Sequence, residues 1–259
     1  MQLNKLIIEP RIRSASAAVD LGFVLGRLFW LRSVSLYMVL VIPVFLITHL
    51  IFEETSAVPF LIMWWLKPLF ERSTLFMLSR ELFSERMGFW NTLRNYKLWL
   101  FPGLIKILIT RRISLGRSFY APIILLEQPK GKDYTKRRHV ISLNYASSAN
   151  WLNIVLIHVE SFLSFAAIIL VTTLWPGLID LSELFTDENL SGAIYFDLLA
   201  MLCIVFVAPF YTTAGFVLYI SRRIELEGWD IEICFRDWVT DFKQRSSVIK
   251  RNQKEAVDV

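Results

Sequence analysis

The sequence predicts an all-helical integral membrane protein, a bundle whose helices cross the bilayer several times. Hydrophobic residues make up 55% of the 259-residue chain and the mean hydropathy is +0.48, both high for a water-soluble fold. The charged residues, 28 Lys and Arg against 23 Asp and Glu, concentrate between long apolar stretches. Lipid is therefore the expected surrounding of those stretches. Each should be a helix, because hydrocarbon offers backbone groups no partner outside the segment.

The first 32 residues form a basic leader that contains an amphipathic segment. Residues 15–31 are apolar but carry Asp20 and Arg27, and no small-residue cleavage site follows them, so we expect the leader to be retained. One face at helical spacing holds Ala18, Leu21, Leu25, Leu28 and Phe29. This pattern predicts a cytoplasmic helix that lies in the membrane interface.

Four later stretches are long enough to cross a bilayer core of about 30 Å, which needs roughly 20 apolar residues in a helix. They cover residues 33–52, 57–79, 151–175 and 193–220. Residues 98–109 are also apolar, but they are few, and Pro102 and Lys106 interrupt them. The sequence thus predicts one membrane domain, 33–220, that contains four clear spans and a basic cytoplasmic region, 80–150. The total becomes five if one weak segment crosses, and six if both do.

The placement of Lys and Arg predicts which side of the membrane each loop faces. The leader and the region 80–150 carry clusters of basic residues, whereas the turn with Glu53 and Glu54 and the acidic segment 180–188 carry none. Short loops rich in Lys and Arg stay on the cytoplasmic side. Four spans with both termini in the cytoplasm satisfy every loop.

Residues 221–259 follow the last expected span and balance eight basic residues against eight acidic ones. Apolar residues recur there at helical spacing, at Ile224, Ile231, Phe235, Trp238 and Phe242. The pattern predicts a cytoplasmic helix that faces the membrane surface or a partner. Beyond about Arg245 the composition predicts a disordered tail.

Glu160 and Lys67 are the charged residues that fall deepest in the expected spans. Glu160 lies about nine positions into the third span, which at about 1.5 Å per residue is close to the bilayer midplane, and Lys67 reaches a similar depth in the second. Pro68 should kink the helix beside Lys67, and Pro209 should kink the fourth span. Two interpretations stay open: a structural ion pair, or a polar site where a substrate or a proton passes.

Sequence motifs of catalysis and metal binding are not visible. The three histidines, His49, His139 and His158, form no H-E-x-x-H arrangement, and the chain has no G-x-S-x-G, no phosphate-binding loop and no dinucleotide fingerprint. Cys203 lies in an apolar run and Cys234 in a charged segment, so we expect no disulfide between them. The sequence predicts a protein that is not an enzyme and holds no cofactor or metal.

Two groups of residues are candidates for contact with lipid head groups or with a protein partner. The first lies in the basic region and consists of Arg117, Arg137 and Arg138. The second follows the last span and consists of Arg222, Arg223, Glu227, Trp229 and Asp230. Cytoplasmic retention explains the first group, and charge pairs that fix the exit angle of the helix explain the second. The competing hypotheses are recognition of anionic lipid and docking of a cytoplasmic protein, with Trp229 and Trp238 as anchors; nucleic acid is not expected.

Several strings resemble a known group of proteins. They are residues 64–72 (WWLKPLFER), 78–83 (LSRELF), 117–127 (RSFYAPIILLE) and 227–236 (EGWDIEICFR). Together they resemble an uncharacterised family of proteobacterial inner-membrane proteins. The block from Leu218 to Asp230 is also similar to the ending of the glycerophosphodiesterase membrane-domain group, in its non-catalytic part. The resemblance implies a bacterial inner-membrane location and an all-helical fold, with as many as six membrane helices, and it implies no activity.

These observations support two ranked hypotheses of function. The first is a non-enzymatic scaffold or assembly subunit that holds protein partners at the cytoplasmic face, and the alternative is a transport or lipid-handling protein that uses the polar site near Lys67 and Glu160. An intramembrane enzyme ranks well behind both. An accessible cavity that reaches Glu160 favours the alternative, whereas a sealed interior with an exposed apolar cytoplasmic patch favours the scaffold.

Overall fold

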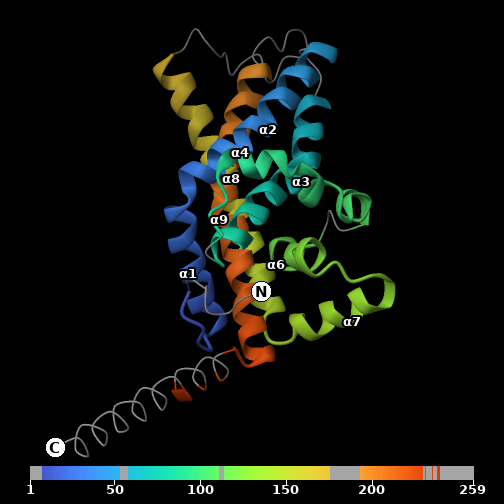
Figure 1. Cartoon of the computed structure of the whole chain (residues 1–259). Helices are drawn as coiled ribbons and strands as arrows, with labels where there is room; N and C mark the ends of the chain where they lie inside the picture. Colours follow the sequence, from blue (N-terminus) through green and yellow to red (C-terminus); the bar gives the residue numbers. More distant parts are fainter. Residues whose placement is uncertain are drawn as a thin grey trace, which may run out of the picture.

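The computed structural model describes residues 8–52, 58–83, 85–110, 114–175, 193–229, 231, 235 and 238–239, and these residues form an all-helical fold without strands. Figure 1 shows the arrangement of its helices. The elements in chain order are α1 (Ala15–Leu28), α2 (Trp30–Ile51), α3 (Val58–Glu81), α4 (Phe89–Arg94), α5 (Tyr96–Leu100), η2 (Lys106–Thr110), α6 (Arg117–Pro122), η3 (Ile123–Glu127), α7 (Gly131–Ser142), α8 (Ala146–Leu174) and α9 (Ala193–Glu227), where η marks a π-helical turn. The predicted all-α class is confirmed.

Three helices are long and apolar enough to cross a membrane: α2, α8 and α9. They coincide with three of the four expected spans. The longest, α9, has 35 residues and extends for about 52 Å at about 1.5 Å per residue, which exceeds the bilayer core of about 30 Å. One end of α9 can therefore project beyond the hydrocarbon.

The helix α3 covers the remaining expected span but is not among these three. Its 24 residues are long enough to cross, yet it carries buried charged side chains at Lys67, Glu71 and Arg72. The helices α2 and α9 pack against α3 and bury these charges. Since a buried charge is unfavourable without a partner, the surrounding helices must supply partners for them. Whether α3 crosses the membrane stays a prediction.

The leader helix α1 packs lengthwise against the C-terminal half of α9 (Figure 1). The contact uses small residues: a Cβ added to Gly22 would lie 2.4 Å from the Cα of Ala214, so only glycine allows this approach. Ala18 and Leu25 are buried there as the amphipathic pattern predicts, but Leu28 is 72% exposed. The buried face thus follows the small residues rather than the largest apolar ones.

The basic region between α3 and α8 consists of short helices rather than one long one. The apolar segment 98–109 is divided between α5 and η2 and is interrupted at Gly103, whose φ of +62° ends the helical path. Within its described residues this segment forms no continuous helix of membrane-spanning length. In Figure 1 these elements lie beside α3, while α6 and α7 lie beside the lower part of α9.

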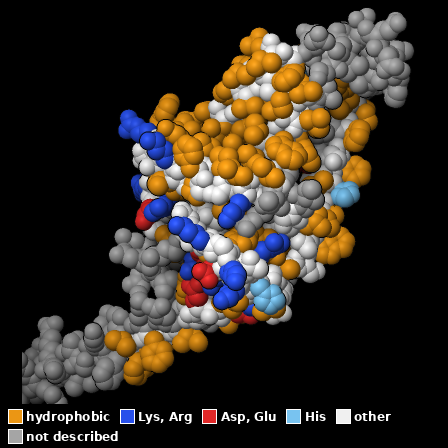
Figure 2. Space-filling model, turned by 90° about the vertical axis from the view of Figure 1, so that its right-hand side faces the viewer, with side chains coloured by type: hydrophobic (Ala, Val, Ile, Leu, Met, Phe, Trp, Pro, Cys, Tyr) orange, Lys and Arg blue, Asp and Glu red, His pale blue; other side chains and the backbone are white. Residues whose placement is uncertain are grey.

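Side-chain chemistry differs between the two ends of the molecule. In Figure 2 apolar side chains cover most of the upper part, and many Lys, Arg, Asp and Glu side chains gather lower down. The upper part contains the C-terminal ends of α2 and α8 and the N-terminal ends of α3 and α9. The lower part contains α6 and α7 (Figure 1). This division is typical of a protein that is half embedded in lipid and half in contact with water.

Candidate functional site

Lys67 is placed in the interior of the bundle by the middle of α3. The side chain is 9% exposed, and Pro68 follows it directly inside the helix. The backbone carbonyl of Lys67 accepts a hydrogen bond of 3.4 Å from the hydroxyl of Tyr37 on α2. Helix packing therefore fixes the backbone beneath the ammonium group, although the side chain itself points toward α8.

Glu160 lies on α8 and forms an ion pair with Lys67, Nζ to Oε2. The carboxylate side chain is 15% exposed. The two residues that the sequence places at similar depth thus meet across the bundle, 93 positions apart in the chain. Such a pair gains little net stability, because desolvation of both charges offsets their attraction. An ion pair of this geometry is expected both for a structural pair and for a polar substrate site. What distinguishes the two interpretations is the space around the pair.

A cavity of about 330 Å³ adjoins the ion pair between α3, α8 and α9. We call it the intramembrane cavity. Its polar lining consists of Lys67, Arg117, Glu160, Ser161 and Ser164. Its apolar lining consists of Phe60, Trp64, Ile157, Phe165, Ile168, Ala200 and Ile204. The volume lies at the lower end of the range for small-molecule sites, about 300–1,000 Å³.

The intramembrane cavity exists because the second half of α8 stands apart from the rest of the bundle. The buried residues of α8 are Ala149, Leu152, Asn153 and Leu156, all in its first half. Beyond them α8 leans away from α9 toward its C-terminal end (Figure 1). Phe165 on the cavity wall is 66% exposed and Trp64 opposite is 41% exposed. The cavity is therefore open to the surface of the molecule, beside α3 and α8.

Arg117, at the start of α6, lines the intramembrane cavity and pairs with a second carboxylate. Its Nη2 donates a hydrogen bond of 3.0 Å to Oε1 of Glu71 on α3, and its guanidinium lies 5.2 Å from the ring centre of Tyr211. Burial lowers the pKa of Arg117, but the Glu71 carboxylate more than offsets this, so the pKa stays above its ordinary value. Arg117 is thus a fixed cation that is already neutralised by its partner.

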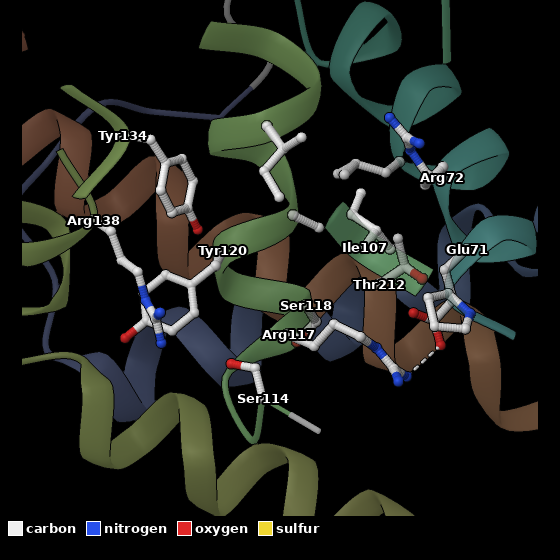
Figure 3. A pocket seen from close by; sticks show the side chains of 14 residues that line it. Glu71, Arg72, Ile107, Ser114, Arg117, Ser118, Tyr120, Tyr134, Arg138 and Thr212 are labelled. Carbon is white, nitrogen blue, oxygen red and sulfur yellow. Dashed lines mark hydrogen bonds and ion pairs between the residues drawn. The ribbon is translucent and has the colours of Figure 1, made fainter. Parts of the chain in front are cut away.

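A second and smaller cavity of about 30 Å³ lies on the other side of Arg117, between α3, α6 and α7. Figure 3 shows Arg117 reaching from α6 toward Glu71 on α3, with Arg72 above them. The guanidinium of Arg72 donates to the backbone carbonyls of Leu100 and Pro102, which ties α3 to the end of α5. Because its lining is mostly apolar and most of its charged groups have partners, this cavity offers little to a charged ligand.

Arg138 lies at the edge of the small cavity and is exposed. Its guanidinium stacks over the ring of Tyr120 at 4.6 Å, as Figure 3 also shows. Contact of Arg138 with a lipid head group stays a prediction.

A closed network of ion pairs joins η3, α7 and α9 at the lower end of the molecule. Arg137 donates to both oxygens of Glu127 at 2.6 and 2.8 Å, and to Glu227 at 2.9 Å. Arg223 donates to the same Glu227 at 2.7 and 3.0 Å, and the Tyr219 hydroxyl donates to Glu127 at 2.5 Å. Hydrogen bonding to Glu127 is the main reason that the pKa of Arg137 lies above its ordinary value. Two arginines and two glutamates therefore satisfy one another.

This network changes the interpretation of the residues beyond the last span. Trp229, expected as an exposed anchor for a partner, is only 5% exposed, because it packs beside Phe83 and Arg223 and donates to Glu227. Arg222 is also buried and pairs with Glu225 at 2.8 Å. The expected docking role of Trp229 is therefore corrected to an internal packing role.

Arg222, Arg223 and Glu227 agree with the simpler interpretation, in which charge pairs fix the end of the helix. Asp230, the last residue of that group, lies outside the described residues.

Sequence reasoning missed Glu71, the partner of Arg117, and Glu127, the centre of the lower network. A signal for Glu71 was present, since it follows Lys67 by four residues and thus shares a face of α3 with it. The pairing with Arg117 was not readable, because it depends on how α6 folds back against α3. Sequence reasoning also gave no sign of the approach of Asp197 on α9 to His49 on α2, at 3.5 Å.

No protein-family model, curated protein or solved structure matches this chain. The resemblance to inner-membrane proteins therefore stays an expectation, and the site is interpreted from its own geometry.

Proposed function

We propose that the chain is a lipid-handling membrane protein that receives the polar head group of a lipid in the intramembrane cavity. One observation carries this proposal: an open cavity of about 330 Å³ reaches the Lys67–Glu160 pair between α3 and two helices, α8 and α9, that are long and apolar enough to cross a membrane. A purely structural ion pair needs no adjoining space. Charged side chains beside a cavity at membrane depth are typical of substrate sites.

The walls of the cavity favour a lipid over a small ion or a proton. Polar side chains form one part of the lining, and aromatic rings form another: Phe60 is half-buried, and Trp64 and Phe165 are exposed at the surface. A head group in the polar part can leave its acyl chains outside, between α3 and α8, without exposing them to water. Entry from the side of the bundle requires no pore across the protein.

The proposal includes a membrane arrangement that goes beyond the three apolar helices. In it α3 is a fourth span, so both termini and the short helices of the basic region lie in the cytoplasm, and the membrane is the bacterial inner membrane. The concentration of Lys130, Lys132, Arg137 and Arg138 around α7 supports this orientation. The charges of α3 are compatible with crossing because Glu160, Arg117 and backbone carbonyls pair them.

The test is whether the purified protein retains phospholipid through the intramembrane cavity. Ser164→Phe places a ring into the cavity from α8, and Thr173→Phe places the same ring on the outer part of the same helix. The two hydroxyls are matched, since each bonds a carbonyl of its own helix, at 2.9 Å from Ser164 and 2.7 Å from Thr173.

We expect native mass spectrometry of the detergent-purified protein to show bound phospholipid in the wild type and in Thr173→Phe, and a loss of at least tenfold in Ser164→Phe. Equal retention in all three proteins would mean that the lipid binds elsewhere, and the proposal would then be wrong.

A second candidate function, the non-enzymatic scaffold, is favoured by the segment after α9. Phe235 and Trp238 are 62% and 63% exposed there, next to exposed Ile231 and Val239. Exposed aromatic side chains beside charged ones are typical of protein interfaces. If this segment holds a cytoplasmic partner, Phe235→Ser should abolish co-purification of a stoichiometric partner from native membranes, whereas Lys132→Ser should not. Neither candidate function requires a catalytic step.

A further inference from the structure

We propose that the intramembrane cavity selects a zwitterionic phospholipid, whose ammonium group pairs with Glu160 while its phosphate pairs with Lys67. The inference rests on the proposed function and adds the class of lipid. The ligand would enter between the two side chains and replace each partner of the ion pair by a group of the same sign.

The charges that line the cavity lead to this choice. Of its charged side chains, Arg117 is already paired with Glu71, so Lys67 and Glu160 are the two that a ligand can engage. A ligand that separates them must compensate both, because a buried charge without a partner is strongly unfavourable. An anionic head group pairs with Lys67 but leaves the Glu160 carboxylate without a cation. A head group that carries both charges pairs with Lys67 and with Glu160. The cavity therefore fits a molecule that is neutral overall but dipolar.

The hydroxyl groups near Glu160 add a second point of recognition. Ser161 and Ser164 both line the cavity within about one helical turn of Glu160. Each hydroxyl donates to a carbonyl of α8, at Ile157 and Glu160, both at 2.9 Å, and Ser164 also bonds the Cys203 thiol, so each hydroxyl oxygen keeps at least one lone pair that can accept. A primary ammonium has three N–H donors, which matches one carboxylate and two hydroxyl acceptors. An ethanolamine head group thus fits this wall better than an anionic glycerol head group, which lacks an ammonium.

The lateral opening points to the lipid rather than to a free, water-soluble zwitterion of the same chemistry. The exposed rings of Trp64 and Phe165 lie at the mouth of the cavity. They offer apolar contact area to acyl chains, which soluble phosphoethanolamine lacks.

The experiment measures lipid preference in the full chain purified in detergent. Phosphatidylethanolamine and phosphatidylglycerol with identical acyl chains compete at equal concentration, and native mass spectrometry counts each bound lipid; soluble phosphoethanolamine is added in a separate arm. We expect at least tenfold preference for phosphatidylethanolamine in the wild type and no displacement by phosphoethanolamine. We expect Glu160→Gln to bring the preference below twofold, because the anionic lipid then leaves no charge unpaired.

The control is the pair Arg32–Glu81, which joins α2 and α3 at 3.0 Å and does not line the cavity. Glu81→Gln should keep the tenfold preference. Preference of the wild type for phosphatidylglycerol would overturn the inference while bound lipid still supports the proposed function. Displacement of the lipid by phosphoethanolamine would also overturn it. If the Ser164→Phe variant retains lipid as well as the wild type does, both the inference and the proposed function fail. The wild-type comparison decides the inference even if Glu160→Gln does not fold.

Discussion

Neutralising one partner of the Lys67–Glu160 pair should cost more stability than replacing both partners. In Glu160→Gln the side chain of Lys67, only 9% exposed, loses its charged partner, and the neighbouring Glu71 is already bonded to Arg117. Removing one partner of a buried pair costs about 3–5 kcal/mol. Because the Glu160 side chain is 15% exposed, the pair is not fully buried, and we expect the lower end, about 3 kcal/mol in the free energy of unfolding.

The double replacement Lys67→Met with Glu160→Leu removes both charges and leaves apolar side chains of similar length. Replacing a buried pair in this way is often neutral or stabilising. We therefore expect the double variant to unfold within about 1 kcal/mol of the wild type. The matched single variants, Lys67→Met and Glu160→Leu, should each cost about 3 kcal/mol. With a double variant within about 1 kcal/mol of the wild type, the coupling energy between the two positions is about 5–7 kcal/mol.

The assay is reversible unfolding in mixed micelles by titration with sodium dodecyl sulfate, followed by tryptophan fluorescence. A parallel cycle on Arg32 and Glu81 is the control, because the Arg32 side chain is 66% exposed and exposed pairs couple by about 0–1 kcal/mol. Additive costs at Lys67 and Glu160, with a double variant about 6 kcal/mol less stable than the wild type, would refute the idea that these charges depend on each other.

Three further predictions concern the helices around the site. Gly22→Ala should destabilise the protein by about 1–3 kcal/mol, because the new methyl group meets the backbone of α9, whereas Gly88→Ala meets nothing within 4 Å and should leave the melting temperature unchanged. Arg137→Ala should raise amide hydrogen exchange in α7 at least tenfold by removing its bonds to η3 and α9, and unchanged protection would contradict this role. A Lys130→Cys variant should react at this position with a membrane-impermeant thiol reagent only after the membrane is disrupted, because residue 130 is expected in the cytoplasm. Labelling of this position in intact spheroplasts would show that the proposed orientation is wrong.

Much of the fold could be predicted from hydrophobicity and length, because lipid imposes simple rules on a chain. Three apolar stretches became the helices α2, α8 and α9 close to the expected bounds. The depth argument for Lys67 and Glu160 used only the fixed rise of a helix, and the two side chains do meet. The sequence pattern did not single out Gly22, which allows the close approach of α1 to α9.

The rest depends on contacts between distant parts of the chain, which no local pattern encodes. The pairing of Arg117 with Glu71 requires α6 to fold back onto α3, and the network around Glu127 requires η3, α7 and α9 to meet. Trp229 illustrates the resulting error, since an aromatic residue among charges is equally consistent with an interface and with internal packing. The cavity itself could not be predicted, because it arises where α8 separates from its neighbours.

The most direct measurement is electron cryo-microscopy of the chain, bound to an antibody fragment, in nanodiscs that contain phosphatidylethanolamine. The account predicts density for a lipid head group in the intramembrane cavity, with its phosphate within hydrogen-bond distance of Lys67 Nζ, its amine beside the Glu160 carboxylate and its acyl chains leaving between α3 and α8. A closed cavity with the Lys67–Glu160 pair intact, or a cavity that holds only acyl-chain density, would contradict it.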